Sequence, residues 1–461
     1  MKRTGMTGRA GAAGMASKLA TAAETTRPRL REPHLIIEGG RPLSGEVSLP
    51  GAKNAALPAL VAACLADEEV TLRNVPLGLN DVQKLIQLLQ DSGAEVRREG
   101  DDLICRGGGW RGGTLSGELA GKIRHSLLLL GASASWRQGL FLPLPGGCSI
   151  GNRKHDLHLS ALQQMGYRME ESELGLHLAA SEPHPESVVD FAYPTFGGTL
   201  NVLFAAVQSR STVTLRNAAR NPEVLDVIEL LGAMGADIRW TEPGTLRIRG
   251  VERLHAAEHT VMGDRIIAAT IISAVGATRG SAIIRNATTQ VLEAETAAWR
   301  SAGLRIEELP GAIRVAWERP LRPVDVVTTA YPGFHTDIQP LHTVLMMHAM
   351  GTSELSDTIL DGRFSYCEEL NKLGADITVR DGSFTCVNGA PGQTAVISGT
   401  GQLYGTDLIA TDIRGGAAVA VAAMAAAGTS RITNLYQLER GYDRFREIFT
   451  ALGASITRVD E

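Results

Sequence analysis

The chain has 461 residues, of which 44% are hydrophobic and 5% aromatic, and its formal net charge at pH 7 is −5. This length and apolar content are enough for two hydrophobic cores in a soluble protein, and the acidic balance argues against a surface that coats nucleic acid. The five cysteines are scattered and form no CxxC pair. That pattern argues against a disulfide framework and a zinc site, and it favours a reducing compartment such as the cytoplasm.

Two segments bear on whether the chain is targeted or anchored. Residues 1–33 are rich in Ala, Arg, Gly, Ser and Thr, with no acidic residue before Glu24. They lack the apolar stretch of a secretory signal, so we expect a disordered tail or a start codon farther along, with an amphipathic targeting peptide as the alternative. The alanine-rich segment 415–428 is too short and too weakly apolar to span a bilayer, and it predicts a helix buried between sheets.

Six times along the chain, at intervals of about seventy residues, an apolar helical pattern runs into a glycine and then into a short alternating strand. The copies read LLQDSGAEV, ALQQMGYRM, LLGAMGADI, AWRSAGLRI, LNKLGADIT and TALGASITR. Their turn glycines are Gly93, Gly166, Gly235, Gly303, Gly374 and Gly453. Such a repeat predicts six copies of one α/β supersecondary unit, which divide evenly into two domains with a boundary near residue 262.

A polar corner precedes the helix of each copy. Five corners follow a β-rich run and carry Asn or Asp, namely Asn74, Asn217, Asn286, Asp361 and Asn434. After Asn217, Asn221 can cap a helix whose first residue is Pro222, and Gly235 ends it. In the second copy the corner is LFLPLPGGCSIG, where glycines and Cys148 replace the ordinary turn.

Cys148 is the first candidate for chemistry. A free cysteine is most often a small buried hydrophobe, but three glycines and two prolines around this one predict a mobile loop. Arg153, five residues on, would lower the pKa of the thiol. Cys148 could therefore act as a nucleophile or as a proton donor. The sequence does not place His155, His158 or His335 beside it as a partner.

Basic and acidic residues at other corners form the second group of candidates. Lys53 and Asn54 lie where a strand turns into a helix opening, which is a plausible anion site. Four arginines also lie at polar corners or helix starts, and together they could converge on a dianion between two domains, although any one of them also suits a structural ion pair. They are Arg124, Arg153, Arg414 and Arg440. Asp337 and Asp412 lie in short loops, where helix capping and general-base catalysis are both open.

Five segments carry a family resemblance. KNAALP from Lys53, the cysteine loop LPGGCSIGNR, PGFHTDIQ, ATDIR and ERGYDRF occur in this order. In these motifs, and in its six repeats from about residue 34 onward, the chain resembles the UDP-N-acetylglucosamine enolpyruvyl transferases. The related EPSP synthases share the fold, but their GNAGTxxRP segment is absent here and a cysteine loop stands instead.

The resemblance implies a fold and a reaction. The expected fold is a two-domain inside-out α/β barrel with six repeats of a βαβαββ-type unit, three per domain. The implied domains are residues 34–52 plus 262–461 and residues 53–261, with 1–33 as a tail. The reaction would transfer the enolpyruvyl group of phosphoenolpyruvate (PEP) to a hydroxyl of a uridine nucleotide sugar and release phosphate. It would need no cofactor, metal, nucleic acid or membrane.

The resemblance also assigns roles. Cys148 would supply a proton to PEP, and Asp337 would accept the proton of the acceptor hydroxyl. The PEP-binding residues would be Lys53, Arg124, Arg153 and Arg440, and Lys53 and Arg440 would also be catalytic. Asp412 and Arg414 would help to assemble the closed site. The acceptor would be bound by Asn54, Arg124, Arg153, Lys154, His155, Asp156, Leu157, Thr195, Gly197 and Asp337.

Departures from the family pattern lie on the acceptor side. RPxDL becomes Arg153-Lys154-His155-Asp156-Leu157, SVGAT becomes residues 195–199 with Phe196 and Gly198, and a family glutamate is replaced by Asn221. Three hypotheses therefore stand: transfer to the 3-hydroxyl of UDP-N-acetylglucosamine, transfer to another uridine nucleotide such as uridine monophosphate, and a non-catalytic regulator that binds a nucleotide sugar. Lys154 and His155 would meet a nucleotide phosphate or lie on an exposed loop. The oligomeric state stays open.

Overall fold

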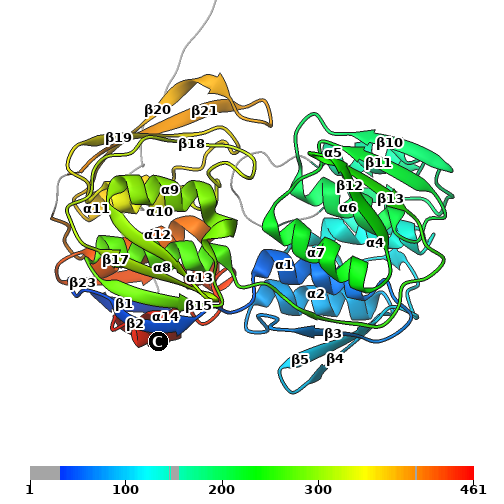
Figure 1. The fold of residues 1–461 in the computed structure, drawn as a ribbon, viewed down its shortest axis with the longest axis horizontal. Coiled ribbons are helices and arrows are strands. Elements are labelled where there is room, and N and C mark those ends of the chain that lie inside the picture. The colour runs from blue at the N-terminus through cyan, green and yellow to red at the C-terminus, as the bar shows by residue number, and fades with distance from the viewer. Residues whose placement is uncertain (1–31, 145, 147–154, 400–401, 461) are drawn as a thin grey trace, which may run out of the picture.

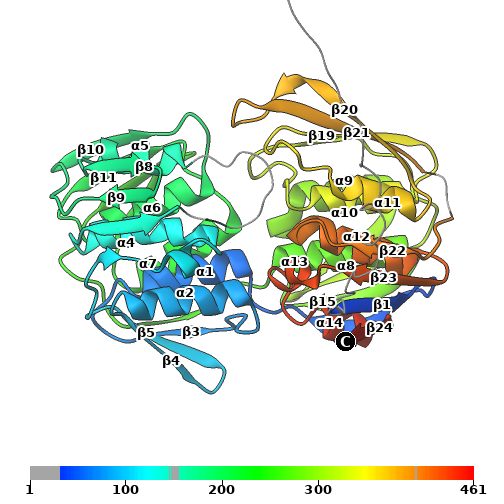
Figure 2. The same ribbon diagram turned by 180° about the vertical axis from the view of Figure 1, so that it is seen from behind.

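The computed structural model describes residues 32–144, 146, 155–399 and 402–460, which form two lobes side by side (Figure 1). The core of the first lobe is drawn from residues 52–261. The core of the second lobe combines residues 35–49 with residues 266–456. Seen from behind, the same two lobes remain separate bodies (Figure 2). The N-terminal strands thus belong to the same core as the C-terminal half of the chain.

Three four-stranded sheets cover the first lobe. In each sheet the first two strands are parallel and the others are antiparallel, as the βαβαββ pattern requires. In spatial order the sheets are β14 (Ala257–Thr260), β3 (Val70–Arg73), β5 (Asp102–Arg106), β4 (Glu95–Glu99); β6 (Gly113–Thr114), β7 (Leu140–Pro143), β9 (Gly175–Leu178), β8 (Met169–Ser172); and β10 (Glu186–Asp190), β11 (Thr212–Arg216), β13 (Thr245–Arg249), β12 (Asp237–Glu242).

The second lobe repeats this arrangement with three more sheets. The N-terminal strands β1 and β2 complete two of them: β1 pairs with β23 and β24 near the far end of the chain, and β2 pairs with β15 from its middle. In spatial order the sheets are β2 (Ser44–Ser48), β15 (Ser281–Arg285), β17 (Ala312–Trp317), β16 (Leu304–Leu309); β18 (Val326–Thr328), β19 (Thr352–Asp357), β21 (Pro391–Ser398), β20 (Asp376–Thr385); and β22 (Asp407–Ile409), β23 (Thr429–Thr433), β1 (His34–Glu38), β24 (Ser455–Val459).

Helices fill the inside of each lobe, and sheets lie outside them (Figures 1 and 2). The inner helices are α1 (Lys53–Ala63), α4 (Leu128–Ser135) and α6 (Phe196–Ala206) in the first lobe and α8 (Arg265–Ala277), α10 (Gln339–Met346) and α12 (Ile413–Ala425) in the second. The remaining α-helices are α2 (Asn80–Asp91), α3 (Gly117–Ala120), α5 (Asp156–Gln164), α7 (Pro222–Ala233), α9 (Glu293–Ala302), α11 (Tyr366–Lys372), α13 (Leu435–Glu439) and α14 (Phe445–Ala451). Inner helices are apolar on all sides because every face meets protein.

The alanine-rich segment forms most of α12. Twelve residues of this helix are buried, which confirms the predicted buried helix. No helix within the described ranges is long and apolar enough to cross a membrane.

The repeat glycines behave as the sequence predicts. Each follows a helix, has a positive φ between 93° and 117°, and leads directly into a strand. They terminate α2, α5, α7, α9, α11 and α14 because glycine takes this backbone conformation at least cost. The six predicted turns are confirmed.

The polar corners are confirmed in four copies and corrected in one. Asn74, Asn217, Asn286 and Asn434 have φ between 54° and 58°, and each side-chain amide donates to a backbone carbonyl that follows the adjacent parallel strand. In the fifth copy the left-handed residue is Gly362 and not Asp361, because glycine is available there. Asn221 occupies the N-cap position of α7, but its side chain accepts no capping hydrogen bond. The corner with Cys148 lies outside the described residues.

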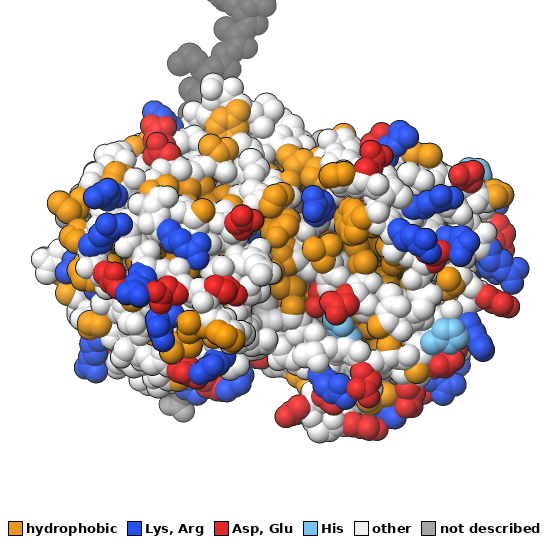
Figure 3. All heavy atoms as spheres, viewed as in Figure 1, with side chains coloured by type: hydrophobic (Ala, Val, Ile, Leu, Met, Phe, Trp, Pro, Cys, Tyr) orange, Lys and Arg blue, Asp and Glu red, His pale blue; other side chains and the backbone are white. Residues whose placement is uncertain are grey.

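The two lobes are joined where the chain crosses between them twice. Gly51 and Gly263 form an antiparallel bridge, and each approaches a corner asparagine so closely that a β-carbon would collide with its carbonyl oxygen. Buried ion pairs also link the lobes: Arg440 contacts Asp81, and Arg265 Nε lies 2.8 Å from Glu223 Oε1. Hydrophobic side chains gather along the boundary between the lobes (Figure 3).

The glycine turns give a stability prediction. We expect Gly235→Ala to lower the free energy of unfolding by about 1–2 kcal/mol, because φ is +95° at this position. Gly232→Ala, three residues earlier within α7, should raise it by about 0.5–1 kcal/mol, because a β-carbon there meets open space in a helical backbone. Urea denaturation of the two variants checks both signs, and equal effects would contradict the backbone explanation.

Candidate active site

A cavity of about 370 Å³ lies between the lobes and is lined by residues of both. The inner helices begin around it. The lining residues at these helix starts are Lys53 (α1), Arg124 (in the 3₁₀ turn before α4), Thr195 (α6), Asp337 (before α10) and Arg414 (α12). The start of α8 adjoins it, because Asp264 Oδ2 accepts the backbone N–H of Lys53 at 3.2 Å. Helix N-termini carry positive potential, so the fold itself favours an anion here.

Asp81 organises the first cluster of charges. It lies in the first turn of α2, and its carboxylate is 3.0 Å from Lys53 Nζ and 3.1 Å from Arg440 Nε. Arg440 also donates to the carbonyl of Lys122 at 3.2 Å. Lys53 and Asp81 come from the first lobe and Arg440 from the second. This carboxylate therefore fixes two cations from different lobes at one wall of the cavity.

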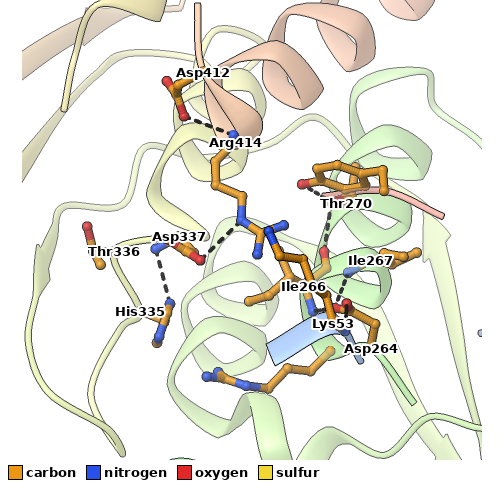
Figure 4. Close-up of polar contacts among 12 residues, drawn as sticks. Lys53, Asp264, Ile266, Ile267, Thr270, His335, Thr336, Asp337, Asp412 and Arg414 are labelled. Atoms are coloured by element: carbon orange, nitrogen blue, oxygen red, sulfur yellow. Dashed lines mark hydrogen bonds and ion pairs between the residues drawn. The ribbon is translucent and has the colours of Figure 1, made fainter. Parts of the chain in front are cut away.

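Asp337 organises the second cluster. Its Oδ1 lies 2.9 Å from Arg363 Nη2, and its Oδ2 lies 3.1 Å from Arg414 Nε. Asp412 accepts the backbone N–H of Arg414 at 2.9 Å and so caps α12 (Figure 4). The two arginines fix the orientation of the Asp337 carboxylate at the cavity wall.

The cavity has an excess of positive charge. Five lining side chains are cationic (Lys53, Arg124, Arg363, Arg414 and Arg440), and two are carboxylates (Asp81 and Asp337). Arg363 Nε is buried and has no hydrogen-bond acceptor among the described residues. Burying such a donor costs free energy unless an acceptor arrives. The arrangement is suited to binding a small, multiply charged anion.

Burial changes the protonation of several groups at this cavity. It lowers the pKa of the Lys53 ammonium, and Asp81 offsets that shift only in part. Burial opposes the ionisation of Asp81, but Lys53 and Arg440 hold the pKa of this carboxyl below its usual range. Burial, with Arg124 nearby, lowers the pKa of His158 to about 3. His158 is therefore neutral, and its Nδ1 lies 2.6 Å from the Asn201 amide.

A second cavity of about 460 Å³ adjoins the first and shares five residues with it, namely Arg124, Leu157, Thr195, Phe196 and Leu360. Its other walls carry few charges. Aromatic rings and neutral polar groups line it instead, among them Tyr193, Phe196, Asn221, Tyr331, Thr336 and Asn388. Burial raises the pKa of Tyr193 to about 12, so its phenol is neutral. This cavity suits a larger, mostly uncharged body with aromatic and hydroxyl groups.

The structure brings most of the predicted site residues together. Lys53, Asn54, Arg124, Leu157, Thr195, Gly197, Asp337, Arg414 and Arg440 line the first cavity. Asp156 lines the second cavity, and Asp412 lies behind Arg414 as a helix cap. His155 lines neither, and its Nε2 lies 2.8 Å from Glu171 Oε1. Cys148, Arg153 and Lys154 lie outside the described residues.

Four polar or charged residues at the first cavity were not assigned to the site from the sequence. Asp81, His125, His158 and Arg363 all line it. Arg363 had a usable signal, because it follows the polar corner at Asp361 just as other candidates follow theirs. Little in the sequence marked Asp81 as a site residue, because acidic residues are common in the first turn of a helix.

The other cysteines are unsuited to surface chemistry. Cys64, Cys105, Cys367 and Cys386 are free and buried. Their exposed fractions are 1%, 0%, 2% and 3%. Burial also raises the pKa of the Cys367 thiol to about 12. Among the described cysteines, none offers a reactive thiolate to a ligand.

Comparison with known proteins extends over nearly the whole chain. The family model described as EPSP synthase (3-phosphoshikimate 1-carboxyvinyltransferase) matches residues 37–449. A UDP-N-acetylglucosamine 1-carboxyvinyltransferase from Novosphingobium aromaticivorans is 38% identical, covering 92% of this chain and 99% of that protein. One of the same name from Oleidesulfovibrio alaskensis is also 38% identical, covering 93% and 99%.

Comparison with solved structures points to the same family of folds. The enolpyruvyl transferase NikO from Streptomyces tendae superimposes with a TM-score of 0.82 at 25% identity, covering 93% of this chain and 99% of that one. An EPSP synthase from Acinetobacter baumannii gives a TM-score of 0.69 at 16% identity over 93% of this chain and 100% of that one, which shows a common fold. The predicted fold class is thereby confirmed. The chain belongs to the EPSP synthase family and, within it, to the UDP-N-acetylglucosamine 1-carboxyvinyltransferases.

Proposed function

We propose that this protein transfers the enolpyruvyl group of PEP to the 3-hydroxyl of UDP-N-acetylglucosamine and releases phosphate. One observation carries the proposal: a strongly cationic cavity adjoins a larger, mostly neutral one, and Asp337 lies on the wall of the first cavity beside the residues that wall the second. The names and identities of the relatives supply the acceptor.

The first cavity suits PEP. Its phosphate and carboxylate would be held by Lys53, Arg124 and Arg440. Asp81 holds Lys53 and Arg440 in place, and Arg124 begins the 3₁₀ turn before α4. Arg153 would join them from outside the described residues. Positive groups that are already oriented stabilise negative charge as it moves toward the departing phosphate.

The second cavity suits the acceptor. The uridine nucleotide sugar would lie against Asp156, Leu157 and Thr195, with Asn54 and Gly197 at the entrance to the first cavity. The acceptor hydroxyl would then meet PEP beside Asp337, whose carboxylate is oriented by Arg363 and Arg414. Proximity and orientation of this kind account for much of the catalysis of a reaction between two bound substrates.

The proton transfers follow from this placement. Asp337 accepts the hydroxyl proton as the oxygen attacks C2 of PEP, and Cys148 gives a proton to the methylene carbon, so a tetrahedral phosphate ketal forms. The methyl group then loses a proton, the bond between C2 and the phosphate oxygen breaks, and the enol ether and inorganic phosphate result. In this proposal Asp337, at the wall of the first cavity, is the general base, and Cys148, which lies outside the described residues, is the general acid.

This activity would make the protein the enzyme of the first committed step of peptidoglycan precursor synthesis, working in the cytoplasm. Its partners would be PEP and the nucleotide sugar.

A second acceptor class is favoured by one observation. Asn221 and Phe196, two of the departures from the family pattern, both line the second cavity. They would contact whatever nucleotide binds there. Transfer to another uridine nucleotide, such as uridine monophosphate, is therefore the alternative.

The acceptor assignment is tested with the purified protein, PEP and a panel of uridine nucleotides, by measuring phosphate release. We expect turnover with UDP-N-acetylglucosamine and little with uridine monophosphate, because the relatives act on the nucleotide sugar that their name gives. If only uridine monophosphate supports turnover, the acceptor is a uridine nucleotide other than UDP-N-acetylglucosamine. If no phosphate is released with either acceptor, enolpyruvyl transfer is contradicted. A reaction without PEP is the background control.

The cysteine loop is tested by substitution. Cys148→Ala should lower the rate of phosphate release by about 100-fold or more and leave nucleotide binding within a few fold, because it removes an acid and not a binding group. Cys148→Asp should retain part of the activity. Cys105→Ala is the matched control, since that thiol is buried in β5 and neither it nor its neighbours in the chain line either cavity. Full activity of Cys148→Ala would end the proton-donor assignment.

The buried ammonium gives a pH prediction. Lys53 binds PEP while it is protonated, and its lowered pKa means that this charge is lost as pH rises, at a lower pH than for an ordinary lysine near 10.4. The KM for PEP should therefore rise on the alkaline side while the KM for the nucleotide stays flat. Steady-state kinetics at a series of alkaline pH values checks this, and the nucleotide serves as the internal control. A flat KM for PEP up to the ordinary lysine pKa would contradict the assigned role.

A further inference from the structure

His335 lies two residues before Asp337 and both are held by one tight turn. The Nδ1 atom of His335 accepts the backbone N–H of Asp337 at 3.1 Å (Figure 4). The backbone N–H of His335 itself donates to Glu295 Oε1 at 2.8 Å. Thr336, between them, is buried and donates to Asp357 Oδ2 at 2.7 Å. The turn is therefore fixed at every residue.

The hydrogen bond at Nδ1 determines which ring nitrogen carries the proton. Because Nδ1 accepts an N–H, a neutral imidazole must carry its proton on Nε2. Burial, together with Arg265, lowers the pKa of His335 to about 4, so the ring is neutral near pH 7. Nε2 is thus a neutral hydrogen-bond donor with a fixed direction.

Among the residues that the structure describes, the ring makes its hydrogen bond through Nδ1, and none of them accepts a hydrogen bond from Nε2. His335 lines the second cavity, whereas Asp337 lines the first. The turn therefore spans the boundary between the two cavities. A carboxylate faces one side of that boundary and an imidazole N–H is available on the other.

We propose that His335 is a specificity residue for the acceptor: its Nε2–H donates a hydrogen bond to an oxygen of the acceptor substrate, close to the hydroxyl that reacts. Two residues of chain span at most about 7 Å, so the oxygen belongs to the reacting sugar or to the phosphate next to it. A donor at this distance favours acceptors with an oxygen there over those with a hydrogen or a methyl group. The inference rests on the proposed function.

Two substitutions separate this role from a purely structural one. His335→Asn keeps an acceptor oxygen near the place of Nδ1, and so keeps the turn, but lacks the distant donor. His335→Gln places an amide N–H near Nε2 but gives up the bond to Asp337. We expect His335→Asn to raise the Kd for UDP-N-acetylglucosamine about tenfold and His335→Gln to raise it by no more than about threefold. Neither should change the KM for PEP by more than about twofold.

The measurement is isothermal titration of the nucleotide sugar into the full-length variants, with thermal unfolding of each as a check of folding. If His335→Asn binds as tightly as the wild type, or if His335→Gln is not closer to the wild type than His335→Asn, the proposal is overturned and the residue serves only the turn. Wild-type protein that neither binds nor uses this nucleotide sugar contradicts the proposed function instead. The same two variants are then compared with the nucleotide that the wild type does use.

Discussion

The burial of positive charge between two apolar cores is the constraint on which this structure depends. A lysine or arginine taken out of water costs several kcal/mol unless it is paired. Here Asp81 pairs with Lys53 and Arg440, and Asp337 pairs with Arg363 and Arg414. Five cationic side chains and two carboxylates line the first cavity, so an anionic ligand would be attracted to it.

The sixfold repeat explains how so many charges reach one place. In each lobe three inner helices pack together, and the residues at their starts line or adjoin the space between the lobes. The repeat glycines and asparagines determine where each helix ends and where each strand turns. The proposed chemistry therefore depends on residues at helix starts and turns, which are not part of the apolar cores. Beyond their first residues, inner helices such as α8 and α12 are mostly apolar or small, and these parts provide a rigid framework.

The two cavities separate two parts of the proposed reaction. Charges that would hold PEP lie at the first cavity and come from both lobes. Residues that would choose the acceptor lie at the second, where neutral side chains such as Tyr193, Asn221 and Asn388 form the walls. A neutral lining residue can be substituted without changing the balance of buried charge. Substitution of Lys53 or Asp81 would change that balance. This difference offers a physical reason why departures from the family pattern fall on the acceptor side.

The sequence by itself determined the repeat, the turns and most of the cationic residues, because a left-handed turn or a helix start depends on nearby residues alone. Gly235 and Asn217 could be assigned without any knowledge of their neighbours in space. The tertiary structure alone decided that Asp81 joins Lys53 to Arg440, which is 359 residues away. It also decided that Arg363 reaches Asp337, that His155 contacts Glu171, and that His335 lines the second cavity. Such contacts depend on how the lobes and helices pack together, and no local pattern records that geometry.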